Sequence, residues 1–119
     1  MKRTHQPSQD LPKEIFDRAV KELKLGYLNL QDGFFQQAKM NFLLSLEYDP
    51  KCADAFWGLM LVKLEMQNED DLMSKPMQFK KAQFMEECQK ALEYADEVSK
   101  KQYENLLERI IKINEGDNY

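Results

Sequence analysis

The chain has 119 residues, which is long enough for one domain that buries roughly two-thirds of its unfolded surface. Its net charge of −4 argues against a nucleic-acid-binding scaffold, which would carry a basic face. No apolar run approaches the roughly 20 residues needed to span a membrane, and the first ten residues lack the apolar stretch of a secretory signal.

The first half of the chain predicts two helices joined by a turn. Residues 1–10 are predicted to be a disordered leader, and the first helix is expected to begin at Asp10–Pro12. Apolar and small residues then recur at helical spacing: Ile15, Ala19, Leu23, Gly26, Tyr27 and Leu30. Gly33 is expected to end this helix in the left-handed conformation. A second helix is predicted over 34–48, and Asp49–Pro50 closes it.

The second half predicts three more helices. A helix over 51–67 is apolar on almost all sides, so we expect it to be the central element. A loop over 68–75 follows, and then helices over 77–95 and 97–113. Residues 114–119 are expected to be a polar tail. The predicted fold is therefore an all-α domain of about five helices over residues 11–113.

Residues 25–50 resemble the second half of a tetratricopeptide repeat (TPR). The positions that carry the resemblance are Leu25, Gly26, Ala38, Phe42, Ser45 and Pro50. The resemblance implies antiparallel helix hairpins in a right-handed superhelix, with Gly26 and Ala38 where the two helices approach most closely. Two positions depart from the family pattern, because Glu22 replaces the usual Trp and Asn29 the usual Tyr.

A second, stretched repeat would begin at Ala53. Met60 replaces the small residue at its eighth position, so this hairpin is expected to be looser or differently angled. In an unmodified repeat that begins at Ala53, position 27 falls at residue 79. The residue that matches this position is Ala91, so the second hairpin is expected to contain 12 extra residues. The chain is in this respect similar to short bacterial TPR proteins with an extended second hairpin. The helix over 97–113 resembles the solvating cap of such arrays.

The resemblance implies a partner-binding groove on the concave surface. Its residues are predicted to be Val20, Leu23, Tyr27, Leu30, Trp57, Leu61 and Leu64. This surface is apolar, which favours a hydrophobic or helical segment of another protein as the ligand. On this hypothesis, replacing Trp57 and Tyr27 with alanine abolishes partner capture and leaves helicity largely intact. The alternatives are that the fifth helix, the leader or a second copy of the chain covers the groove.

The carboxylate clamp by which some TPR proteins hold acidic chaperone tails is absent. The clamp requires Lys at position 5 and Asn at position 9 of the first repeat. It also requires Asn at position 6 of the next repeat. Those positions hold Leu23, Tyr27 and Gly58. Acidic C-terminal tails are therefore not the expected ligand.

Nothing in the sequence indicates catalysis, a cofactor or a metal. His5 is the single histidine and lies in the leader. Cys52 and Cys88 are too few for a disulfide framework or a metal site, and we expect buried, reduced thiols in a cytoplasmic protein. The predicted function is a non-catalytic protein–protein interaction module. The alternative is a structural subunit whose apolar surfaces drive homo-oligomerisation, such as a homodimer.

Overall fold

The computed structural model describes residues 11–68 and 85–116. Within these ranges every regular element is a helix, which confirms the predicted all-α class. The helices are α1 (Lys13–Gln31), α2 (Phe35–Tyr48), α3 (Ala53–Lys63), α5 (Met85–Tyr94) and α6 (Glu97–Gly116). The predicted leader lies outside the described residues, as do most of the loop over 68–75 and the start of the helix over 77–95.

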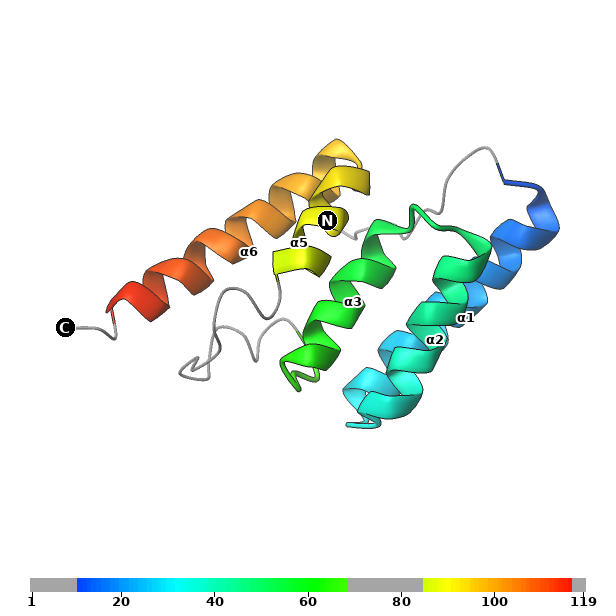
Figure 1. Cartoon of the computed structure of the whole chain (residues 1–119), viewed down its shortest axis with the longest axis horizontal. Helices are drawn as coiled ribbons and strands as arrows, with labels where there is room; N and C mark the ends of the chain where they lie inside the picture. Colours follow the sequence, from blue (N-terminus) through cyan, green and yellow to red (C-terminus); the bar gives the residue numbers. More distant parts are fainter. Residues whose placement is uncertain (1–10, 69–84, 117–119) are drawn as a thin grey trace.

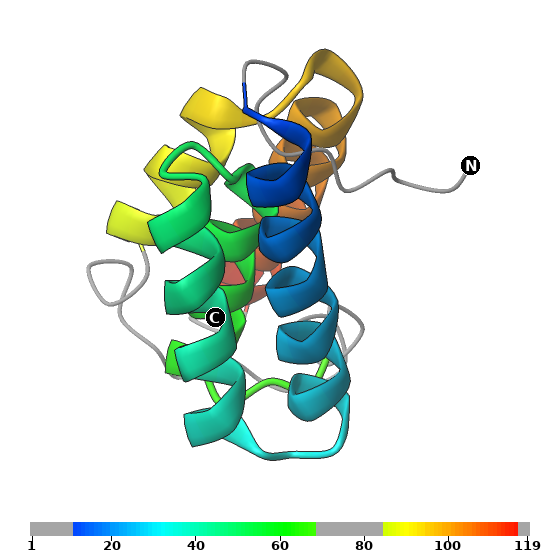
Figure 2. The same ribbon diagram turned by 90° about the vertical axis from the view of Figure 1, so that its right-hand side faces the viewer.

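The helices lie side by side and successive described helices run in opposite directions (Figure 1). A short turn joins α1 and α2 into an antiparallel hairpin (Figure 2). In the view of Figure 1, α3 lies between α2 and α5, and α6 crosses beyond α5. A helix with neighbours on both sides needs apolar side chains on several faces, and this explains the composition of α3. Its buried residues are Asp54, Ala55, Trp57, Gly58, Met60 and Leu61.

Gly33 shapes the turn between α1 and α2, as predicted. Its φ angle of +80° lies in the left-handed region, where a residue with a Cβ is strained. The Gly33 amide donates a hydrogen bond to the Leu30 carbonyl (3.0 Å), and the Phe34 amide donates to the Asn29 carbonyl (2.8 Å). These two bonds form a Schellman motif, which satisfies carbonyls at the end of α1. A local signal therefore positions α2 against α1.

Phe42 of α2 is fully buried and lies against glycines on both neighbouring helices. A Cβ added to Gly26 of α1 would lie 2.6 Å from Phe42 Cε1, and a Cβ added to Gly58 of α3 would also lie 2.6 Å from that atom. The predicted close approach at Gly26 is thus confirmed. The sequence pattern assigned no packing role to Gly58, yet Gly58 lets α3 approach the same ring.

The third helix ends earlier than predicted. The sequence favours a helix to residue 67, but α3 ends at Lys63. Glu65 adopts a φ of 54°, and its amide donates to the Val62 carbonyl (3.0 Å). The Met66 amide donates to the Leu61 carbonyl (2.9 Å), so this turn is a second Schellman motif. Met66 is buried. Its apolar side chain extends the helical spacing of apolar residues beyond Lys63, where α3 ends.

Replacing Glu65 with glycine is expected to raise the free energy of unfolding by about 0.5–1 kcal/mol. Glycine relieves a left-handed strain of about 1–2 kcal/mol but adds freedom to the unfolded chain. Urea denaturation followed by circular dichroism measures the change. Glu104→Gly, an exposed site inside α6, is the matched control and should lower stability by about 1 kcal/mol. Destabilisation by both substitutions would contradict the assigned backbone conformation.

The C-terminal helices confirm most of the predicted boundaries. α6 begins at Glu97, where the Asp96 Oδ1 atom accepts a hydrogen bond from the Ser99 amide (2.7 Å) as a helix cap. It continues to Gly116, three residues past the predicted helix end at residue 113. The last turn of a helix is held by backbone hydrogen bonds and needs no apolar side chains. The polar composition of residues 114–116 therefore does not show where the helix ends.

Candidate functional site

The seven residues predicted to line a concave groove do not form an open apolar surface. Four of them are buried in the hydrophobic core: Leu23, Leu30, Trp57 and Leu61. The other three are half-buried: Val20, Tyr27 and Leu64. A partner therefore cannot reach the middle of the predicted groove without displacing part of the folded chain.

A side chain of α6 covers the centre of the predicted groove. Tyr103 is fully buried and stacks on Trp57, with ring centroids 4.1 Å apart and an interplanar angle of 13°. Its hydroxyl also donates a hydrogen bond to Oδ1 of Asp54. The sequence left open whether the fifth helix, the leader or a second copy covers this surface. The structure shows that α6, which is the predicted fifth helix, covers Trp57.

Tyr27 joins α1 to α3 rather than facing a ligand. Its hydroxyl donates a 2.6 Å hydrogen bond to the backbone carbonyl of Asp54. Its ring meets Phe42 edge to face, at 4.9 Å between centroids and 72° between planes. Asp54 thus accepts hydrogen bonds from tyrosines on α1 and on α6. These contacts hold the first hairpin and the last helix to the same end of α3.

A polar network occupies the two positions, Glu22 and Asn29, where the first repeat departs from the TPR pattern. Asn29 donates to Oδ1 of Asn41 (2.7 Å), and Asn41 donates to Oε2 of Glu22 (3.1 Å). Farther along the same hairpin, the Ser45 hydroxyl donates to the Ala19 carbonyl (3.0 Å). Hydrogen bonds between side chains thus join α1 to α2 where the family usually places aromatic rings. The sequence alone did not reveal that Asn41 links the other two residues.

The surface between α2 and α3 contains a pocket of about 320 Å³, which we call the α2–α3 pocket. Its apolar lining residues are Phe35, Leu43, Leu59 and Val62. Its polar lining residues are Gln36, Lys39, Lys63, Glu65 and Glu87. None of the seven predicted groove residues lines it. A signal for it was present in the sequence, because Phe35, Lys39 and Leu43 recur every four residues and so share one face of α2.

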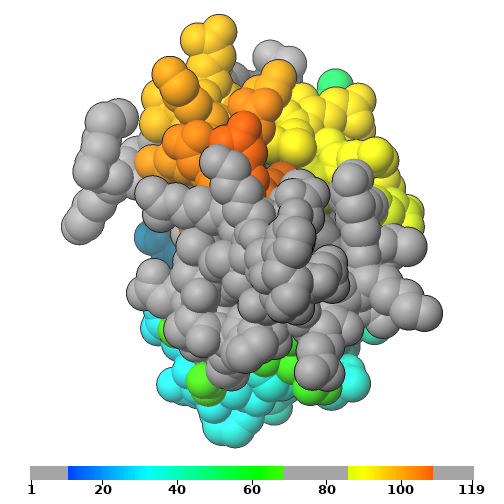
Figure 3. Space-filling view, turned by 90° about the vertical axis from the view of Figure 1, so that its left-hand side faces the viewer, coloured from blue at the N-terminus to red at the C-terminus, as the bar shows by residue number. Residues whose placement is uncertain are grey.

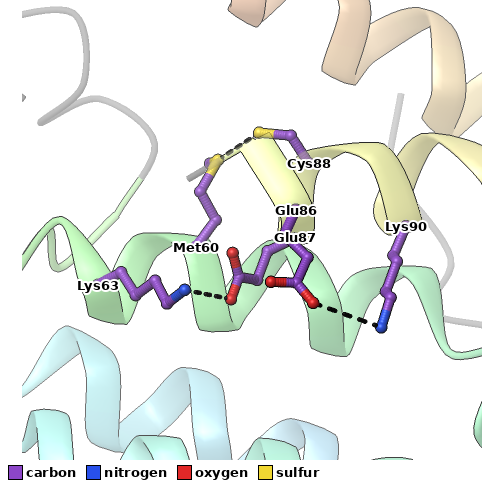
Figure 4. Close-up of polar contacts among 6 residues, drawn as sticks. All are labelled: Met60, Lys63, Glu86, Glu87, Cys88 and Lys90. Carbon is purple, nitrogen blue, oxygen red and sulfur yellow. Dashed lines mark hydrogen bonds and ion pairs between the residues drawn. The ribbon is translucent and has the colours of Figure 1, made fainter. Parts of the chain in front are cut away.

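An ion pair connects the α3 wall of this pocket to α5. Lys63 Nζ lies 2.6 Å from Glu87 Oε1, and the Glu87 side chain is only 13% exposed. Figure 4 shows Lys63 and Glu87 facing each other, while Glu86 turns toward Lys90. The Glu86–Lys90 pair is longer, at 3.9 Å, and exposed, so it contributes little stability. The second oxygen of Glu87 is buried and has no hydrogen-bond partner among the described residues.

Comparisons of this chain with protein-family models, with curated proteins and with solved structures find no match. The TPR resemblance therefore rests on the residues quoted above. Any assignment of function rests on the geometry of the described residues.

Two other kinds of site are absent from the described part of the chain. In residues 11–68 and 85–116, no group of three or more His, Cys, Asp and Glu residues could hold a metal ion. No helix in the same ranges is both long enough and apolar enough to cross a membrane.

Figure 3 shows the α6 side of the molecule, where α5 and α6 lie next to each other and the α1–α2 turn lies at the opposite end.

Both cysteines are free and buried, as predicted. Cys52 precedes α3, and Cys88 Sγ on α5 lies 2.9 Å from Met60 Sδ on α3. Met60 itself is fully buried, so the large residue at the family's small position packs against the next described helix. This contact accommodates Met60 between α3 and α5.

The folded chain is expected to protect both thiols from alkylation. Burial raises the pKa of Cys52 from 9.0 to about 11. The pKa of Cys88 is raised to about 12, mainly by burial and to a smaller extent by the nearby Glu87 carboxylate. Because folding raises both pKa values, the folded state favours the protonated thiols. Their contribution to the free energy of unfolding is therefore complete below about pH 9 and is lost as the pH rises through about 11 and 12. Iodoacetamide labelling, followed by mass spectrometry, should be slow before unfolding in urea and fast afterwards. Equal labelling rates would contradict the burial.

Proposed function

We propose that this chain is a non-catalytic protein–protein interaction module that binds a hydrophobic or helical segment of a partner protein. The observation that carries the proposal is the α2–α3 pocket, whose apolar residues are incompletely buried although three of them, Phe35, Leu59 and Val62, border the core. Leu43, for example, is 45% exposed. Pockets with an apolar lining and a few polar groups are typical binding sites.

In this proposal the helices are TPR-like hairpins of a right-handed superhelix. The alternating helix directions and the contact of Phe42 with Gly26 support it. We place the partner site at the α2–α3 pocket instead of the concave groove, because Trp57 and Leu61 are buried in the core. We also propose a cytoplasmic location, since the chain's two cysteines are buried free thiols.

Two matched charge substitutions on α2 test the site. Leu43→Lys adds a positive charge to the pocket lining, whereas Met40→Lys adds the same charge at a 64% exposed position outside it. The proposal expects a partner, captured from a lysate of the source cells, to bind wild type and Met40→Lys but not Leu43→Lys. Circular dichroism checks that both variants remain folded. Equal capture by the two variants would count against the pocket.

Homo-oligomerisation is the second candidate function, and a different observation favours it. Large apolar side chains are exposed at several positions away from the pocket, including Ile15, Leu25, Leu28, Phe34 and Met40. Exposed apolar surface can mark an interface between copies. Sedimentation velocity at micromolar concentration tests this candidate. A dimer that Leu28→Asp dissociates would support it, and a clean monomer would remove it.

A further inference from the structure

We propose that the α2–α3 pocket receives a long basic side chain, an arginine or a lysine, from the partner protein. The inference rests on the proposed function and names the chemistry that the pocket recognises. Three features of the pocket carry it: its size, its apolar lining and the charge on one of its walls.

The size and lining fit one long side chain with a methylene stem. A volume of about 320 Å³ is at the lower end of the range for ligand pockets and is too small for a whole helix. Leu43 from α2 and Leu59 and Val62 from α3 provide apolar contacts. Lysine and arginine commonly bury their stems on such surfaces and keep the charged group near water.

The charge of the α3–α5 wall favours a cation at the tip of that side chain. The two lysines and two glutamates that line the pocket balance in formal charge, but Lys63 pairs with Glu87 through Oε1 at 2.6 Å, so on the α3 and α5 side Glu65 is left without an ion-pair partner among the described residues. Glu65 also follows the C-terminal end of α3, where the helix dipole is negative. Lys39 belongs to the α2 side of the pocket. A basic tip is therefore expected to lie against Glu65 and away from Lys39.

The backbone of Glu65 allows binding to be separated from stability. Position 65 has a φ of 54°, where glycine is the unstrained residue, and the glutamate places a carboxylate on the pocket at the expense of strain. Glu65→Gly should therefore stabilise the chain and weaken binding of a cation at the same time. A purely structural role for Glu65 would not give these opposite changes.

Three small probes test the proposal on the full chain labelled with ¹⁵N. n-Butylguanidinium carries a stem and a cation, 1-pentanol carries a stem without charge, and butyrate carries a stem with an anion. Nuclear magnetic resonance titrations should show shifts of the Leu43 and Val62 amides, with n-butylguanidinium binding tightest. We expect Glu65→Gln and Glu65→Gly to weaken its binding roughly two- to fivefold, in the range of an exposed ion pair.

Glu86→Gln is the matched control, because Glu86 is exposed, precedes Glu87 in sequence and does not line the pocket. It should leave the binding of n-butylguanidinium unchanged. Equal binding of n-butylguanidinium and 1-pentanol, or preferred binding of butyrate, would overturn the basic side chain but leave apolar docking at the pocket intact. If none of the three probes shifts the pocket amides, both this inference and the pocket as the partner site fail.

Discussion

Replacing Trp57 with alanine is expected to lower the free energy of unfolding by about 3–5 kcal/mol. The side chain is fully buried, and its ring stacks on Tyr103 at 4.1 Å. Truncation would leave a cavity in the core and remove the aromatic pair that holds α6 to α3. Urea unfolding followed by far-ultraviolet circular dichroism measures the change.

An exposed aromatic residue provides the control for this substitution. Phe34 is 55% exposed, so Phe34→Ala should change stability by no more than about 0.5 kcal/mol. The structure thus replaces the sequence-based prediction that alanine at Trp57 and Tyr27 removes a partner and leaves helicity largely intact. A loss of less than about 1 kcal/mol for Trp57→Ala would contradict its place in the core.

Gly58→Ala is expected to destabilise the chain by about 1–3 kcal/mol, although alanine normally stabilises a helix relative to glycine. The added Cβ would lie 2.6 Å from Phe42 Cε1. The ring cannot easily move away, because Phe42 is fully buried and is packed equally closely against Gly26 of α1. The same denaturation experiment measures the loss. The sign is decisive, since helix propensity alone predicts a gain of about 1 kcal/mol.

A double-mutant cycle identifies the clashing partner. In a Phe42→Leu background, a smaller side chain faces Gly58, so Gly58→Ala should cost less than it does in wild type. Equal costs in the two backgrounds would place the clash elsewhere. A gain in stability from Gly58→Ala in wild type would mean that α3 and the Phe42 ring are not in close contact.

The predictions that succeeded depend on signals close together in the chain. The all-α class follows from helical spacing and helix-forming composition. The turn after α1 follows from Gly33, whose φ of +80° suits glycine. The close approach at Gly26 was predicted from a short motif, and the burial of Cys52 and Cys88 from the apolar patterns around them. In each case the relevant signal lies within one hairpin or one helix.

The predictions that failed are those for which the apolar pattern alone was compatible with more than one structure. The apolar pattern of α3 continues to Met66, but the backbone turns at Glu65 and buries Met66 beyond the helix end. Periodicity reports which side chains are apolar, not which backbone conformation places them in the core. Trp57 was predicted to face a ligand for the same reason: an apolar residue on a helix face needs cover, whether from a partner or from the chain itself.

The sequence by itself determined that this chain forms helices, where the first hairpin turns and which residues let its two helices meet. The first two depend on backbone preferences and on side chains three or four residues apart, and the third follows from the motif that resembles a TPR hairpin. Only the tertiary structure decided that Tyr103 covers Trp57, that Gly58 accommodates Phe42 and that a pocket opens between α2 and α3. Each of these depends on how separate helices pack, and the same apolar stripe satisfies the hydrophobic effect equally well in more than one such arrangement.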